Sequence, residues 1–279
     1  MSDFISGGCD KKEVALMDQV KTEAGYVSGA AIGEIGKEVH IYLGIPYAAP
    51  PVGNLRWKPP QPVAPWSGSR QCTDFSKIAL QSTLGNLPPF PQILPSSEDC
   101  LYLNVLTPAK KTTDKLPVMV WMHGGGYQLD NANDPLTNAP RLPQYDVVVV
   151  NVNMRLNAIG LLAHPLLSKE SPKGVSGNYM FLDMIAALQW VQKNIAAFGG
   201  DPKNVTIFGE SGGGAKVSNL MASPLAKGLF HRAICESGTS VGILIVGWPN
   251  WMRLCPYETT LLSNSRKPPT ANEAQITLS

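Results

Sequence analysis

The sequence predicts an α/β fold with a mostly parallel, twisted sheet and helices on both faces. Short apolar runs bounded by turn residues recur at 116–122, 147–152 and 205–210, and such runs are typical of strands buried on both faces. Segments with helical spacing of apolar residues lie between the later runs, and strands that alternate with helices form parallel sheets. In a sheet of this kind the ligand site lies at the carboxyl ends of the strands.

The composition indicates a globular protein and argues against several classes of partner. Of the 279 residues, 44% are hydrophobic and 16% are charged, and the net charge of +2 includes no basic block that would favour nucleic acid or an anionic membrane surface. No stretch is long enough to span a bilayer, and residues 1–30 show no basic segment followed by an apolar one, so no signal peptide is expected.

Cysteine usage indicates a reduced, cytoplasmic setting. The five cysteines form no Cys-x-x-Cys pair and no cluster with histidine, which argues against a zinc site. A segment missing upstream of this chain would instead make the protein secreted.

The first third of the chain is predicted to consist mainly of connections. Residues 1–20 are mixed and polar, as in a frayed terminus. The proline-rich segment 44–57 has too few N–H donors for a central strand and is predicted to be an ordered loop lying across a surface. Residues 59–97 carry many more prolines and are predicted to be long connections, followed by a strand at 101–106.

Residues 179–198 are predicted to form one long helix. One face of that helix carries its apolar residues at helical spacing: Met184, Ala187, Leu188, Val191, Ile195 and Phe198. Gly199 and Gly200 end the helix, and Pro202 lies just beyond.

The later elements continue the alternation of strand and helix. A strand at 205–210 is followed by a predicted helix over 215–221 and a short strand over 232–236. Residues 248–279 show no periodicity, and little fixed structure is expected from about residue 255 onward.

A glycine-flanked serine stands between the strand at 205–210 and the helix that follows. A serine hydroxyl is a weak nucleophile, so an enzyme that uses one must present it in the open beside a base. A sharp strand-to-helix turn does this but crowds the backbone, and glycine two positions before and after Ser211 relieves the crowding, as Gly209 and Gly213 do here. The pentapeptide alone is also compatible with an ordinary strand-to-helix turn.

A second glycine-rich bend follows the strand at 116–122. The run His123-Gly124-Gly125-Gly126 stands where that strand ends, and residues without side chains let backbone N–H groups turn toward a substrate carbonyl. A phosphate-binding loop is the alternative, but the lysine and Ser/Thr of such loops are absent.

Together these motifs give a resemblance to the type-B carboxylesterase family of α/β-hydrolases, which includes bacterial esterases and the cholinesterases. The similarity covers roughly residues 20 to 240. It is carried by the segments at 44–57, 97–104, 123–127, 153–156, 177–179, 198–206 and 228–233.

The resemblance implies an acyl-enzyme mechanism on a small-molecule carboxylic ester, without a cofactor or metal. It implies that Ser211 is the nucleophile and that the N–H groups of Gly125, Gly126 and Gly212 form the oxyanion hole. Glu210 would be a supporting acidic residue, and His123 would brace the oxyanion loop rather than act as a base. Gly212 stands where the family usually has alanine. The glycine keeps the N–H donor but makes the turn more flexible.

The resemblance also implies two structural ion pairs, Arg56 with Glu98 and Arg155 with Asp183. Cys100 matches a family position that is often disulfide-bonded. The usual partner position is occupied by Ala79, so a bridge is not assumed.

The triad acid and histidine of the family are not recognised in this chain. The triad order in this fold is serine, then acid, then histidine, but only His231 follows Ser211, and it precedes a strand and should lie at the opposite end of the sheet. His40 and His164 are expected to be structural or exposed. Residues 1–240 are therefore predicted to be the N-terminal portion of a carboxylesterase-type domain, and 241–279 an unrecognised, poorly ordered tail, as in a truncated, frameshifted or incomplete chain.

Two functions from different classes remain open at this point. One is an ester hydrolase that is nearly inactive in the form of this chain, and the other is a non-catalytic interaction protein on the same fold. A thioesterase or amidase is a lesser alternative to both. The acyl and alcohol specificity and the oligomeric state do not follow from the sequence.

Overall fold

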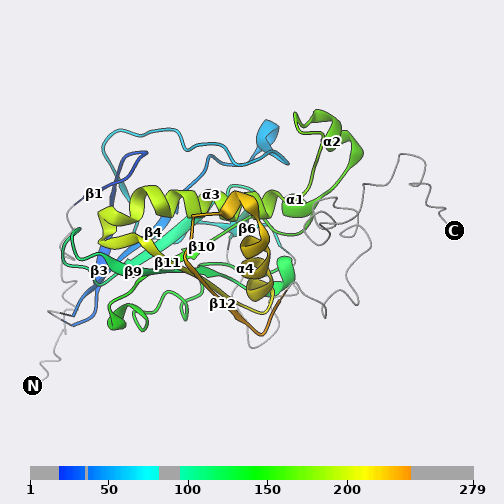
Figure 1. Ribbon diagram of the computed structural model, residues 1–279. Coiled ribbons are helices and arrows are strands. Elements are labelled where there is room, and N and C mark those ends of the chain that lie inside the picture. The colour runs from blue at the N-terminus through cyan, green and yellow to red at the C-terminus, as the bar shows by residue number, and fades with distance from the viewer. Residues whose placement is uncertain (1–18, 35–36, 82–94, 240–279) are drawn as a thin grey trace, which may run out of the picture.

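The computed structural model describes residues 19–34, 37–81 and 95–239. Its centre is a seven-stranded mixed sheet in the order β12-β11-β9-β10-β8-β4-β3 (Figure 1). The strands of this sheet are β3 (Ala30–Ile32), β4 (Val39–Pro46), β8 (Tyr102–Thr107), β9 (Leu116–Met122), β10 (Val148–Val152), β11 (Gly200–Glu210) and β12 (Arg232–Glu236).

The remaining elements are short, apart from two helices. The small strands are β1 (Val20–Lys21), β2 (Tyr26–Ser28), β5 (Ser69–Gln71), β6 (Ile78–Ala79) and β7 (Ser96–Ser97). The α-helices are α1 (Asn157–Leu161), α2 (Pro165–Glu170), α3 (Tyr179–Asn194) and α4 (Gly212–Ala222). The 3-10 turns are η1 (Gly53–Leu55), η3 (Gly125–Tyr127), η4 (Pro143–Tyr145), η5 (Ile195–Phe198) and η6 (Pro224–Ala226). No helix in these described ranges is both long enough and apolar enough to cross a bilayer.

The predicted α/β class is confirmed, with parallel pairing at the core of the sheet. Strands β12, β11, β9 and β10 pair in parallel, whereas β8, β4 and β3 extend the sheet with antiparallel pairs. The helix predicted over 179–198 is α3 continued by η5, and Gly199 ends it in the left-handed conformation (φ 79°). The predicted helix after Ser211 and the strand over 232–236 correspond to α4 and β12.

The main core lies between the sheet and the two long helices. Val118, Val120 and Met122 point from β9 into one cluster with residues of α3 and α4. Helices α3 and α4 therefore share one face of the sheet, where they also contact each other (Figure 1). The sequence predicts helices on both faces. Within the described residues the opposite face carries a smaller cluster of Val39, Leu106 and Val149, and no long helix packs there.

Burial along β9 differs from the prediction, whereas β10 agrees with it. All five residues of β10 are buried, but from Val118 onward β9 alternates between buried and half-buried positions. Trp121 lies on the half-covered side of β9, where its ring packs against Phe208 with centroids 4.9 Å apart. An apolar run can therefore reflect aromatic packing between neighbouring strands as well as burial on both faces.

The prediction of a loop over 44–57 is wrong for its first three residues. Strand β4 continues to Pro46, and Ile45 and Pro46 pair with Leu103 and Tyr102 of β8. Gly44 (φ 68°) lies at a register shift, and its N–H donates to the side-chain oxygen of Asn104 at 2.9 Å. A proline at the last position of a strand removes little pairing, which is why this segment can remain in the sheet.

Three sequence predictions fall on residues that are not described. These are most of the frayed segment 1–20, part of the connection 59–97, and the tail 241–279.

A buried ion pair fixes the end of β10 to α3. The guanidinium of Arg155 donates to both carboxylate oxygens of Asp183, at 2.6 and 2.8 Å, and neither side chain is exposed. The backbone N–H of Arg155 also donates to Asp183, and the guanidinium reaches the carbonyl of Lys58. The second expected pair, Arg56 with Glu98, also forms but is partly exposed.

We predict that Arg155→Met lowers the free energy of unfolding by about 3–5 kcal/mol, because it leaves the Asp183 carboxylate buried without its partner. Urea unfolding followed by circular dichroism measures the change. The matched control is Lys193→Met, which removes an exposed pair with Glu23 and should cost less than about 1 kcal/mol. Equal effects of the two substitutions would contradict the prediction.

Candidate active site

Ser211 occupies a strained turn between β11 and α4. Its backbone has φ 55° and ψ −121°, a region that a residue with a side chain rarely adopts. Holding such a conformation costs on the order of 1–3 kcal/mol, so the surroundings must enforce it. The N–H of Ser211 donates to the carbonyl of Glu236 at 2.8 Å, and its own carbonyl accepts from Ala215. The residue itself is exposed at the carboxyl end of β11, where a ligand can reach it.

The flanking glycines are required by close contacts between backbone segments. A Cβ on Gly213 would lie 2.1 Å from the carbonyl oxygen of Met122, and a Cβ on Gly209 would lie 2.6 Å from the same atom. A Cβ on Gly238, in the turn after β12, would lie 1.8 Å from the carbonyl oxygen of Ser211. The turn at Ser211 is therefore enclosed by the end of β9 on one side and by the segment after β12 on the other.

The second glycine-rich bend meets the first at the same edge of the sheet. Gly125 and Gly126 begin η3 in left-handed conformations, with φ 73° and 57°. A Cβ on Gly124 would lie 3.6 Å from the Cβ of Ser211, and a Cβ on Gly212 would lie 2.6 Å from the nitrogen of Gly126. The two bends therefore touch. An alanine at position 212, which the resemblance leads one to expect, would displace Gly126.

Three backbone N–H groups of glycine residues lie at this junction. Gly125 and Gly126 are the first two residues of η3, and Gly212 is the first residue of α4. The N–H of Gly212 has no acceptor within α4, and successive N–H groups in a tight glycine bend can point at one anionic atom. Glu210 ends β11 beside them with an exposed side chain. No hydrogen bond joins that side chain to Ser211 in the described part of the chain.

His123 is buried behind the glycine-rich bend at Gly124–Gly126, here called the oxyanion loop. It is 1% exposed, and its Nδ1 lies 4.0 Å from a carboxylate oxygen of Asp130. Burial lowers the pKa of His123 well below its ordinary value, and the nearby Lys216 lowers it further, so the ring is neutral.

The other three histidines lie away from Ser211. The backbone of His231 and its Nδ1 both bond to Val205, which lies about 20 Å from Ser211 at the strand rise of 3.3 Å per residue. His164 caps α2 through Nδ1, and His40 lies near the start of β4. All four histidines of the sequence are in the described ranges, and none forms a hydrogen bond with the Ser211 side chain there.

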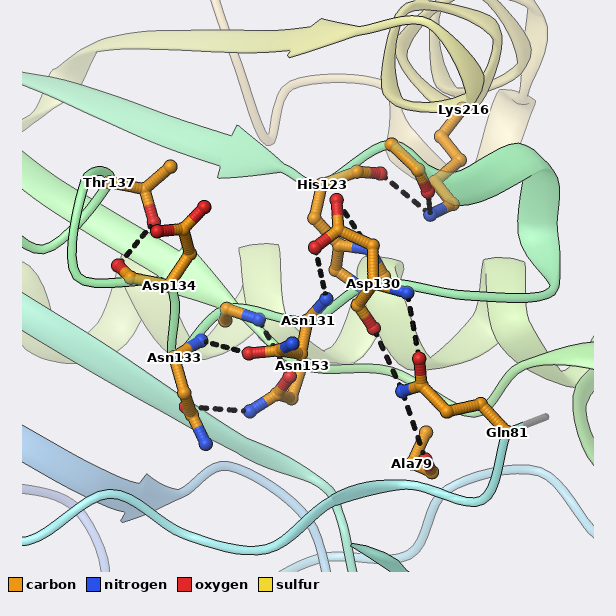
Figure 2. A network of polar contacts seen from close by, with 12 residues as sticks. Ala79, Gln81, His123, Asp130, Asn131, Asn133, Asp134, Thr137, Asn153 and Lys216 are labelled. Carbon is orange, nitrogen blue, oxygen red and sulfur yellow. Dashed lines mark hydrogen bonds and ion pairs between the residues drawn. The ribbon is translucent and has the colours of Figure 1, made fainter. Parts of the chain in front are cut away.

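Lys216 is part of the site, but its position was not singled out from the sequence. The side chain is fully buried on α4, and its Nζ donates to the carbonyl oxygens of His123 at 2.7 Å and Gly124 at 3.1 Å (Figure 2). Burial lowers the pKa of Lys216 to about 7, an effect that the charge of Asp130 partly offsets. The sequence did contain a signal for this buried charge. Lys216 lies beside Val217 and four residues before Leu220, which places it on the apolar face of the helix.

A network of side-chain amides fixes the segment that follows the loop (Figure 2). Gln81 accepts from the N–H of Asp130 at 2.9 Å and donates to its carbonyl at 3.1 Å. Asn153, just after β10, accepts from the N–H of Ala132 and donates to the buried side chain of Asn133. Amide side chains therefore hold this segment, which contains no long helix or strand. In the sequence, the signal for this role was Asn153, a polar residue directly after an apolar strand.

Comparison with known proteins identifies the family of the chain. A model of the Carboxylesterase family matches residues 17–249. The chain is 45% identical over 236 residues to a fumonisin B1 esterase of Sphingopyxis macrogoltabida, covering 84% of this chain and 43% of that protein. It is 44% identical over 231 residues to carboxylesterase 5A of Canis lupus familiaris, covering 79% and 39%.

The solved structure of a PNB esterase has a similar backbone. Its TM-score is 0.69 at 44% sequence identity, with 79% of this chain and 44% of that chain covered. The chain therefore spans about two fifths of the length of the relatives it matches.

We predict that the stability difference between the wild type and Lys216→Met depends on pH. The pKa of Lys216 is about 7 in the folded protein and 10.5 ordinarily, so between these values the unfolded chain binds the extra proton. The contribution of Lys216 to stability therefore rises with pH across this window. From pH 7.5 to 8.5 the wild type should gain about 1 kcal/mol relative to Lys216→Met in urea unfolding. A pH-independent difference would contradict the prediction.

Proposed function

Because the chain belongs to the Carboxylesterase family, we propose that its domain cleaves carboxylic esters through acylation of Ser211. The observation that carries the proposal is the contact between the strained turn at Ser211 and the bend at Gly124–Gly126. An exposed hydroxyl beside the backbone N–H groups of two glycine-rich bends is the arrangement that acyl transfer requires.

In this proposal Ser211 Oγ attacks the ester carbonyl carbon, and the carbonyl oxygen becomes an oxyanion. The N–H groups of Gly125, Gly126 and Gly212 stabilise that oxyanion, and removal of a single such donor typically costs about 10²–10³ in rate. Collapse of the intermediate expels the alcohol and leaves the acyl group on Ser211. Water then attacks the acyl-enzyme and releases the carboxylic acid.

The reaction also needs a group that takes the proton of Ser211. None of the four histidines of this chain lies beside that hydroxyl in the described structure, and His231 bonds to Val205 of β11, about 20 Å from Ser211. We therefore propose that these 279 residues, by themselves, turn esters over very slowly. The triad acid and histidine are assigned to no residue of this chain.

The proposed substrate is a small-molecule carboxylic ester. The similarity to a protein named fumonisin B1 esterase supports this class. The mechanism proposed here places no requirement on a metal or an organic cofactor.

An interaction protein without catalysis is the second candidate, and the lack of a histidine beside Ser211 is the observation that favours it. The strained conformation of Ser211 argues against it, because a surface used only for binding has no need to maintain such a turn.

We predict that purified protein hydrolyses p-nitrophenyl acetate at a rate on the order of 10⁶-fold below that of a complete serine triad, since loss of a triad histidine costs about that factor. Spectrophotometric initial rates, with Ser211→Ala as the control, measure the Ser211-dependent part. Robust Ser211-dependent turnover would refute the missing-base proposal.

We predict that a fluorophosphonate probe labels Ser211 slowly in the folded protein, because the oxyanion donors also stabilise the phosphoryl oxygen during attack. Peptide mass spectrometry identifies the labelled residue. Ser211→Ala and urea-unfolded protein are the controls, and neither should be labelled. Absence of labelling in the folded wild type would favour the interaction protein.

A further inference from the structure

Lys216 is a buried cation that the proposed mechanism does not use. It lies on α4, five residues after Ser211, with no exposed surface. Desolvating an ammonium group is costly unless it is paired and hydrogen-bonded. Within the described residues no carboxylate lies within ion-pair distance of its Nζ, and the hydrogen bonds of that group go to two carbonyl oxygens of one loop.

The two carbonyls belong to the loop that supplies the oxyanion donors. The carbonyl oxygen of Gly124 and the N–H of Gly125 are parts of a single planar trans peptide unit, in which they point in opposite directions. A hydrogen bond that holds this oxygen therefore also fixes the direction of the N–H. A positive charge at the oxygen further polarises the unit and makes the N–H a stronger donor.

We propose that Lys216 is a positioning residue for the oxyanion hole. Its ammonium group donates hydrogen bonds to the carbonyls of His123 and Gly124 from the side of α4. These bonds orient the Gly125 N–H away from Lys216 and toward the substrate oxygen beside Ser211. The inference rests on the proposed function for the role of Gly125, whereas the link between Lys216 and the Gly125 peptide is testable without any reaction.

The alternative is that Lys216 only ties α4 to the loop. A tie would work equally well with a neutral donor, whereas the proposed role depends on charge. The titratable groups that face Lys216 are His123 and Asp130 from the loop side and the ring of Tyr127, 5.8 Å from Nζ. His123 loses its proton at lower pH than an ordinary histidine, so its titration is separable from that of Lys216.

The first test follows the amide signal of Gly125 by NMR in protein labelled with ¹⁵N-glycine. In the wild type the Gly125 ¹H and ¹⁵N shifts should titrate with a midpoint near pH 7, as Lys216 loses its proton. The titration should persist in Ser211→Ala and in Lys193→Met, which removes an exposed lysine, and should vanish in Lys216→Met. No titration in the wild type, or the same titration in Lys216→Met, overturns the inference.

The second test measures the rate of fluorophosphonate labelling of Ser211 between pH 6 and 8.5. Lys216→Met should slow labelling about 10-fold at pH 6, which is less than the loss expected when an oxyanion donor is removed. The effect should be smaller at pH 8.5, where wild-type Lys216 is neutral. Lys216→Arg, which keeps the charge, should recover part of the rate. A pH-independent loss, or none, overturns the inference. If wild type is not labelled at all, the proposed function fails, and the NMR titration still decides the role of Lys216.

Discussion

The site depends on how closely three backbone segments approach one another at the carboxyl edge of the sheet. The end of β9, the turn at Ser211 and the start of α4 pack so tightly that a single methyl group on Gly209 or Gly213 would overlap the carbonyl of Met122. This packing holds Ser211 in a conformation that its own side chain disfavours. The register of β9 against β11, which pairs Met122 with Gly209, brings the two glycine-rich bends to the same level. The register of β9 against β11 therefore also determines the geometry of the site.

Much of this architecture could be predicted from sequence because the signals are local. The apolar runs of β10 and β11, the periodicity of α3 with its glycine stop, and the two glycine-rich bends each depend on neighbouring residues. Parallel strands then bring both bends to one edge, so a long-range contact followed from short-range patterns. The same reasoning failed at Gly44–Pro46, where proline and glycine predict a loop, but a bulge and a strand end accommodate both.

The parts that could not be predicted depend on partners distant in the sequence. Lys216 contacts carbonyls more than 90 positions earlier, and Asn153 holds a loop some 20 positions before it. A polar residue on an apolar face shows that such a partner must exist, because an unpaired buried donor is costly, but not which group it is. The hydrogen bonds of Lys216 also show that α4 contacts the loop after β9 as well as the turn at Ser211. It supplies two hydrogen bonds to the rear of the same loop whose front meets Ser211.

The contact between Ser211 and the segment after β12 has a consequence for how the protein is made. Ser211 reaches its strained geometry with the help of the Glu236 carbonyl and the backbone at Gly238, which lie about 25 residues later in the chain. At synthesis rates of about 5–20 residues per second, those residues leave the peptidyl transferase centre roughly 1–5 s after Ser211 does. A nascent chain that ends before β12 therefore contains the complete glycine-serine motif but only part of the packing that enforces its shape. The turn at Ser211 is therefore completed late, by tertiary docking as well as by its own local sequence.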